Sequence, residues 1–194
     1  MLRPRTSLES RIAYETGIRN RYTDRSYPWT EADFSVFSPE NEPEVLPAYD
    51  GQVFDLGGRV LTACLVPGHS PGSMALIDSK TGTLFAGDCI NCNIGMGISP
   101  AGTGEKVVRV SDGLRYLRQL WAKDFDHNRI FNGHPDFRAA GTPLAENVLP
   151  TAITALEEIL DGAPAEQVYQ PTLSKYVNVY RKDPVMIRFD PDNL

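Results

Sequence analysis

Short apolar runs, several of them alternating with polar residues, occupy the centre of the chain and predict a group of β-strands. Each run is closed by glycine, proline or a polar turn, and the runs lie at residues 52–56, 60–66, 74–77, 84–86 and 129–132. Runs of this length that are rich in β-branched and aromatic residues are typical of strands rather than helices. Lys80-Thr81-Gly82 lies between the third and fourth runs and predicts a hairpin turn.

Two later segments have apolar residues at helical spacing. Ser111 is expected to cap the first helix, in which four residues share one face: Leu114, Leu117, Leu120 and Trp121. Residues 144–160 predict a second helical stretch that Pro150 breaks in two. Gly162 is expected to end this stretch, because glycine readily adopts the left-handed conformation found after helices.

The two ends of the chain carry weaker patterns. Thr6-Ser7-Leu8-Glu9 resembles a capping box and predicts an N-terminal helix. Residues 26–49 are rich in proline and acidic residues and predict a loop that covers another part of the molecule. Near the C-terminus, residues 176–180 and 185–189 predict a hairpin that turns at 182–183.

Composition and charge narrow the class of protein. The 194 residues, 41% of them hydrophobic, suffice for one domain with its own core. A net charge of -6 argues against a nucleic-acid partner, and no apolar run approaches the roughly 20 residues of a membrane span. The first ten residues lack the apolar core of a secretion signal, and the cysteines number three. These features predict a cytoplasmic protein without a disulfide framework and without a membrane partner.

Three of the predicted strands end at residues able to bind a metal. His69, Asp88 and His134 each follow a strand end, and histidine nitrogen and aspartate oxygen are ordinary ligands of zinc, iron and manganese. A single histidine after a glycine is more often a plain turn residue. Three such residues at successive strand ends favour a site on a rigid scaffold.

A serine nucleophile is the competing interpretation of the same stretch. Gly68-His69-Ser70-Pro71-Gly72 fits the pattern of a nucleophile elbow, and Asp88 and His134 follow in the order of a hydrolase triad. Pro71 argues against it, because the elbow needs a backbone N–H after the serine. The elbow must also lead into a helix, whereas residues 73–77 predict a strand.

Together these motifs resemble the metallo-β-lactamase superfamily. The segments VPGHSPGS (66–73), LFAGD (84–88) and FNGH (131–134) are similar to signatures of its glyoxalase II-like hydrolases, and the resemblance extends from about Asp50 to about Gly162. It implies an α/β fold of the αββα sandwich type. It also implies that His69 ligates one metal ion, Asp88 bridges two and His134 ligates the other. Such enzymes use metal-bound hydroxide to hydrolyse thioesters, esters, lactones, β-lactams or phosphodiesters.

The chain departs from the family in lacking its main ligand motif, H-x-H-x-D-H. No histidine precedes His69. The chain is therefore expected to be mainly the C-terminal half of the sandwich, as one partial domain over residues 1–194, with a helix and cover loop at 1–49 and a β/α core at 50–194. The complete family site holds one or two ions of zinc, iron or manganese. His69, Asp88 and His134 fall short of a closed two-metal site and suffice at best for one ion with open positions filled by water.

The cysteines offer one further ligand. Cys89 and Cys92 have the spacing of a metal half-site, and Cys92 could complete a tetrahedron, although small residues lining a pocket are the favoured interpretation. Cys64 alternates along a strand and predicts packing. His127 lies in a charged segment and is expected to be solvated.

Three hypotheses about function follow. The first is a metal-dependent hydrolase of small thioesters, esters or lactones, incomplete as this chain alone and completed by a second copy or a partner chain. The second is an inactive half-domain that acts by binding or assembly. The third is a reduced site with one metal ion, held by His69, Asp88 and His134, with or without Cys92.

Overall fold

The structure is a computed structural model in which residues 46–99, 107–134 and 141–194 are described. The chain divides into two compact units, Met1–Pro47 and Ala48–Leu194, and the second contains all the elements given below. The predicted N-terminal helix, and the predicted cover loop up to residue 45, lie outside the described residues. None of the described helices is long and apolar enough to cross a membrane.

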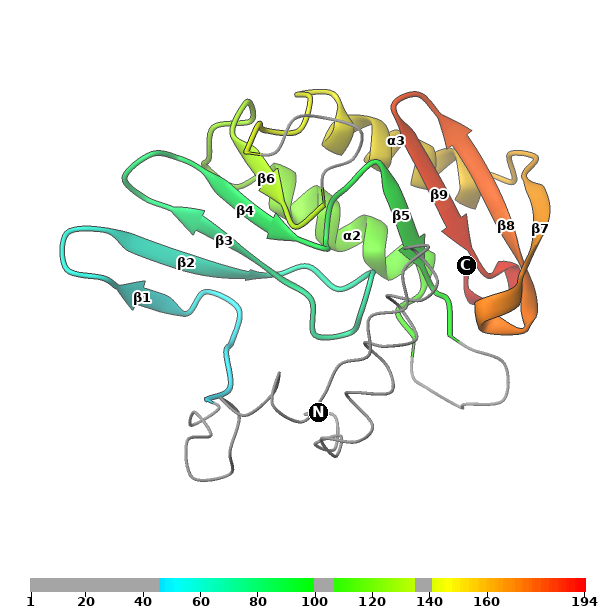
Figure 1. The fold of residues 1–194 in the computed structure, drawn as a ribbon, viewed down its shortest axis with the longest axis horizontal. Helices are drawn as coiled ribbons and strands as arrows, with labels where there is room; N and C mark the ends of the chain where they lie inside the picture. The colour runs from blue at the N-terminus through cyan, green and yellow to red at the C-terminus, as the bar shows by residue number, and fades with distance from the viewer. Residues whose placement is uncertain (1–45, 100–106, 135–140) are drawn as a thin grey trace, which may run out of the picture. The chain divides into compact units, whose positions relative to one another are not determined.

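The first sheet has the strand order β1-β2-β3-β4-β6 (Figure 1). Its strands are β1 (Val53–Asp55), β2 (Val60–Leu65), β3 (Met74–Asp78), β4 (Leu84–Gly87) and β6 (Ile130–Asn132). The first four pair in antiparallel fashion, with the turn at residues 79–81 joining β3 to β4 as predicted. β6 then pairs parallel to β4. All five strands coincide with predicted runs.

A second sheet has the strand order β5-β9-β8-β7. Its strands are β5 (Asn93–Met96), β7 (Glu166–Gln170), β8 (Lys175–Lys182) and β9 (Val185–Phe189). β8 and β9 form the predicted hairpin, but β5 and β7 were not predicted. β5 is only four residues long and pairs parallel to β9, so its partner lies far away in the sequence. The described residues therefore contain two sheets.

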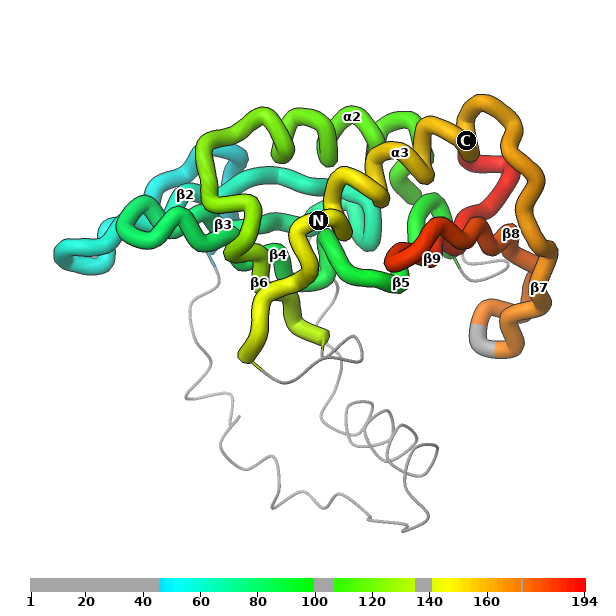
Figure 2. The backbone as a smooth tube through the Cα atoms, turned by 90° about the horizontal axis from the view of Figure 1, so that it is seen from above, coloured from blue at the N-terminus to red at the C-terminus, as the bar shows by residue number. Residues whose placement is uncertain are grey.

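Two α-helices complete this unit, α2 (Val110–Trp121) and α3 (Val148–Leu160), and both lie on the same side of the strands (Figure 2). The residue that caps the N-terminus of α2 is Arg109 rather than the predicted Ser111, which lies inside the helix. Pro150 does not break α3, because it occupies the first turn, where a backbone N–H has no partner within the helix. Gly162, with φ of +87°, follows α3 as predicted. The predicted α/β class is confirmed, with two short 3-10 helices, η3 (Pro171–Leu173) and η4 (Pro191–Asn193).

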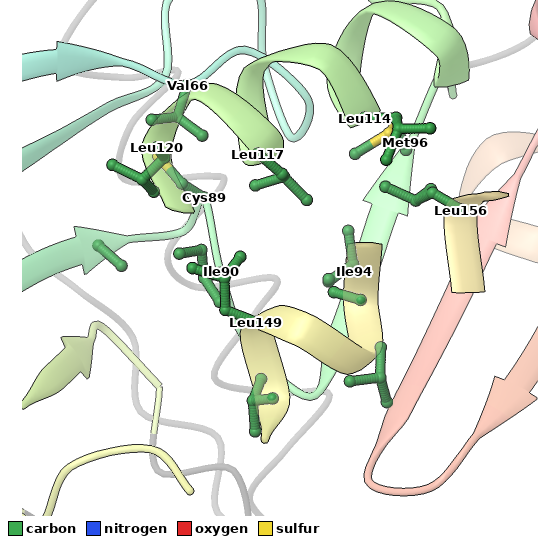
Figure 3. Close-up of a cluster of buried hydrophobic side chains, with 14 of the residues drawn as sticks. Val66, Cys89, Ile90, Ile94, Met96, Leu114, Leu117, Leu120, Leu149 and Leu156 are labelled. Carbon is green, nitrogen blue, oxygen red and sulfur yellow. The ribbon is translucent and has the colours of Figure 1, made fainter. Parts of the chain in front are cut away.

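The hydrophobic core lies between the two helices and one face of the sheets (Figure 3). Helix α2 contributes the predicted stripe of Leu114, Leu117 and Leu120, while Trp121 is only partly buried. The strands contribute alternate residues, among them Leu84, Ala86, Ile94, Met96 and Ile187. Residues between these positions point to the opposite face of the sheets, as the two-residue period of a strand requires.

Met96 is the tightest contact between β5 and α2. Its side chain lies directly over Gly113, and a Cβ atom at that position would stand 2.3 Å from Sδ and 2.7 Å from Cε. Met96 is 2% exposed, so it has little room to withdraw. A glycine inside a helix usually weakens it relative to alanine, and here the close approach of the thioether explains its presence.

We expect Gly113→Ala to lower the free energy of unfolding, although alanine is the better helix former. The overpacking penalty of about 1–3 kcal/mol exceeds the gain in helix propensity of about 1 kcal/mol. In a Met96→Ala background the same change should instead stabilise, because the obstructing side chain is gone. Urea unfolding of the four variants measures both effects; equal effects of Gly113→Ala in the two backgrounds would contradict this packing.

A polar network joins α3 to the second sheet. Glu158 accepts hydrogen bonds from the Tyr180 hydroxyl (2.6 Å) and from the Lys182 ammonium group (2.8 Å). Lys182, followed by Tyr180, lowers the pKa of Glu158, and the same contact raises the pKa of Lys182. A carboxyl whose pKa is lowered by folding stabilises above its ordinary pKa, and this stabilisation is lost as the pH falls through the folded-state value.

Glu158→Gln should therefore lower the melting temperature at pH 7, with a difference from the wild type that shrinks as the pH falls through the carboxyl range. Below that range Glu158 is protonated and resembles glutamine, so the two proteins should converge. Melting curves between pH 3 and pH 7 test this, with Glu146→Gln as the exposed control before α3. A difference that does not change with pH would show that the charge plays no part.

Candidate metal site

The parallel pairing of β4 with β6 brings together two residues that are 46 positions apart in the sequence. The register shifts between Phe85 and Gly87, and the Gly133 N–H donates to the Gly87 carbonyl oxygen at 3.2 Å. Gly87 has φ of +51°, a conformation that favours glycine. As a result Asp88 and His134 emerge side by side, with His134 Nε2 2.9 Å from Asp88 Oδ1.

His69 lies in the turn between β2 and β3, which two serines close. The Ser70 N–H donates to Ser73 Oγ at 3.0 Å, and the two hydroxyl oxygens lie 2.8 Å apart. The Val66 N–H also donates to the Ser73 carbonyl oxygen at 2.9 Å. Ser70 is thus engaged with Ser73, and the chain continues into β3 rather than a helix, which agrees with the rejection of a nucleophile elbow.

The side chain of Met96 also supports this turn. A Cβ atom placed on Gly68, the residue before His69, would stand 3.0 Å from Met96 Cε. Met96 therefore contacts the backbone of the His69 turn and the backbone of α2 at Gly113. The packing of the core fixes where the turn, and with it His69, is placed.

The two predicted histidine ligands thus lie around the carboxylate of the third predicted ligand, Asp88. His69 Nε2 lies 3.9 Å from Asp88 Oδ2, and His134 Nε2 approaches the other oxygen, Oδ1. All three side chains are about half exposed, so an ion could reach them from solvent.

This donor set fits a metal by type and by number, because a catalytic zinc uses three protein ligands and leaves a fourth position open. Among the described residues, however, no three histidine, cysteine or acidic side chains are already arranged to hold a metal. His134 Nε2 instead approaches Asp88 Oδ1 directly, at 2.9 Å.

A cavity of about 390 Å³ lies next to this cluster. Its lining comes from strands of the second sheet and from segments that follow strands of either sheet: His69, Asn91, Asn93, Gly95, Ile98, His134, Gln170, Leu173, Val177 and Arg188. The cavity combines apolar side chains with a few polar ones, as binding sites for small molecules do. It places the two histidines where a small substrate can meet them.

The cysteines take no part in lining this cavity. Cys92 packs against the hydrophobic core, while its neighbours Asn91 and Asn93 line the cavity. Burial raises the pKa of the Cys89 thiol to about 12 and also raises the pKa of Cys64. Thiols kept protonated in this way are poor metal ligands, because a metal binds the thiolate. The predicted packing role of Cys64 agrees with its exposure of 1%.

His127 differs from the expectation of a solvated side chain. Its ring stacks on Trp121 with centroids 3.9 Å apart, and it meets the Phe125 ring in a T-shaped arrangement with centroids 4.6 Å apart. The residue therefore closes one end of the core beside α2. The stacking could not be predicted from the charged residues around His127, because its partner Trp121 belongs to the preceding helix.

Sequence reasoning missed the cavity residues of the second sheet. Asn91, Asn93 and Gly95 lie on or before β5, a strand that was not predicted, so their common face could not be inferred. Arg188 had a signal, since it is a charged residue between the apolar residues Ile187 and Phe189 on β9. A charged residue at such a position points to the face opposite the core.

Comparison with known proteins agrees with the motifs. No protein-family model matches the chain. BaeB, a probable polyketide biosynthesis zinc-dependent hydrolase from Bacillus velezensis, is 31% identical over 104 residues, which are 54% of this chain and 42% of BaeB. A hydroxyacylglutathione hydrolase from Synechococcus sp. is 28% identical over 140 residues, which are 72% of this chain and 52% of that enzyme. This similarity supports the resemblance to glyoxalase II-like hydrolases.

The chain spans about half the length of the curated relatives it matches. Among solved structures, a metallo-β-lactamase family protein from Thermus thermophilus aligns with a TM-score of 0.39 and 19% identity, over 78% of this chain and 45% of that chain.

Ser73→Ala should loosen the turn that carries His69, because it removes the acceptor of the Ser70 N–H and the partner of the Ser70 hydroxyl. We expect a loss of about 0.5–1.5 kcal/mol in the free energy of unfolding, the usual net value of one hydrogen bond. Faster amide exchange at Ser70 should accompany it. Ser79→Ala, in the exposed turn before β4, is the control. Unchanged exchange at Ser70 would show that the serine pair does not hold the turn.

Proposed function

We propose that this protein is a metal-dependent hydrolase of a small thioester, ester or lactone. The observation that carries the proposal is the convergence of His69, Asp88 and His134, from three separate strand ends, beside one cavity. The similarity to two hydrolases supports it, and one of them is zinc-dependent by name. The chain spans only about half of each relative. The hydrolase activity and the substrate class are therefore proposals for this chain and are not transferred from the relatives.

Each residue of the cluster has a definite part. His69 and His134 offer imidazole nitrogens, and Asp88 offers two carboxylate oxygens that face different histidines. A zinc, iron or manganese ion bound there supplies Lewis acidity, which polarises a carbonyl group and acidifies water. Asp88 also holds His134 in place before an ion binds, and the cavity beside them shields the reacting bond from bulk water.

The alternative function, binding or assembly without catalysis, is favoured by a different observation. Leu76, Phe85 and Phe131 lie in register across β3, β4 and β6, on the face away from the core. Phe85 is 42% exposed, and the Phe85 and Phe131 rings lie 6.4 Å apart. Apolar side chains gathered in this way often mark a contact surface. Metal content separates the two functions.

Elemental mass spectrometry of the purified chain, before and after dialysis against chelator and reloading with zinc, iron or manganese, tests the proposal. We expect about one ion per chain, the number that three protein donors can hold. His69→Ala and Asp88→Asn should reduce the content to that of the buffer blank. His127→Ala removes a histidine outside the cluster and should leave it unchanged.

Hydrolysis of thioester, ester and lactone substrates should then appear in the reloaded wild type and disappear in His69→Ala. A chain that takes up no metal, or that binds it equally well without His69, would overturn the proposed site and leave assembly as the better account.

A further inference from the structure

The cavity lining carries two chemically different kinds of group. It includes His69 and His134, and it also includes Arg188 of β9. Ile187 and Phe189 are buried in the core, so Arg188 points to the opposite face of the sheet. Its partner across the β5–β9 pair is Gly95, which has no side chain to cover it.

One nitrogen of the Arg188 guanidinium group is buried without a hydrogen-bond partner. This nitrogen is Nε, and no acceptor lies within hydrogen-bonding distance of it. Several other arginines of the described residues are paired, as Arg118 is with Glu157 and Arg115 with Asp112. An unpaired buried donor is unfavourable, and such exceptions call for an explanation. A bound ligand with a hydrogen-bond acceptor would explain this unpaired donor.

The side chains beside Arg188 are polar but uncharged. Asn91, which is only 6% exposed, accepts a hydrogen bond from the Asn93 N–H at 2.6 Å through Oδ1. That bond leaves its amide NH2 group as a donor. Gln170 adds a further amide to the lining. The cavity thus offers one permanent positive charge surrounded by neutral hydrogen-bonding groups, in a chain whose net charge is -6.

We infer that the cavity binds a substrate with a carboxylate group, and that Arg188 is the residue that selects it. A guanidinium group binds a carboxylate through two parallel N–H···O bonds, which also fixes its orientation. One arginine among neutral amides suits the single charge of a carboxylate better than the double charge of a phosphate. The inference rests on the proposed function, since it places the hydrolysed bond beside His69 and His134 and the acid group beside Arg188.

The test uses the full chain, kept free of metal by chelator, and two probes of the same size, butyrate and the neutral butyramide. Titrations followed by two-dimensional NMR should show butyrate moving the amide signals of Asn93 and Gly95, while butyramide leaves them in place. Arg188→Gln should weaken butyrate binding on the order of tenfold or more, because it removes the charged pair. Arg181→Gln changes an exposed arginine on β8 outside the cavity lining and should bind butyrate as the wild type does.

Butyrate affinity that is unchanged in Arg188→Gln, equal shifts by butyramide, or tighter binding of inorganic phosphate would each overturn the inference. If Arg188→Gln does not fold, the wild-type titration still decides. Butyrate that leaves the amide signals of Asn93 and Gly95 unchanged does not bind beside Arg188. If the chain binds butyrate but takes up no metal, the carboxylate site is supported and the proposed hydrolase is overturned. If it takes up metal but does not bind butyrate, the metal site is supported and the carboxylate site is overturned.

Discussion

The candidate site depends on one constraint, the parallel pairing of β4 with β6. A parallel pair needs a long crossover, and here α2 fills it. The carboxyl ends of the two strands therefore meet at the same edge of the sheet. This pairing brings Asp88 and His134 within contact distance.

The placement of the helices separates the packing side of the strands from the chemical side. α2 and α3 lie on one side and bury alternate strand residues in the core (Figure 2). Residues of the other parity, such as Arg188 and Gly95, are left for the cavity. The same alternation sends Cys92 into the core and Asn91 into the cavity. One rule of strand geometry thus decides which residues are available for binding.

Much of the first sheet and both helices could be predicted, because their signals are local. The runs that end at His69, Asp88 and His134 have clear β-prone residues and turn residues. β5 could not be predicted, because it has four residues and its stability comes from β9, about 90 positions later. The prediction for Pro150 was wrong for another reason. The effect of proline depends on where the helix begins, and because α3 begins at Val148, Pro150 lies in its first turn.

The site shows the same division. The ligand types and their order were visible in the sequence, and the structure places them together, but their direct contacts depend on the bulge at Gly87. Asn91 and Arg188 were missed because their common face exists only after the second sheet has formed.

Met96 has a consequence beyond stability. Its thioether touches the backbone at two glycines, Gly68 beside His69 and Gly113 in α2. The three positions act as a single packing unit with a fixed total volume. A side chain at Gly113 requires residue 96 to become smaller, and one at Gly68 requires the terminal methyl group of Met96 to move. The shape of the His69 turn and the surface of a helix more than 40 residues away are thus set by the same methionine.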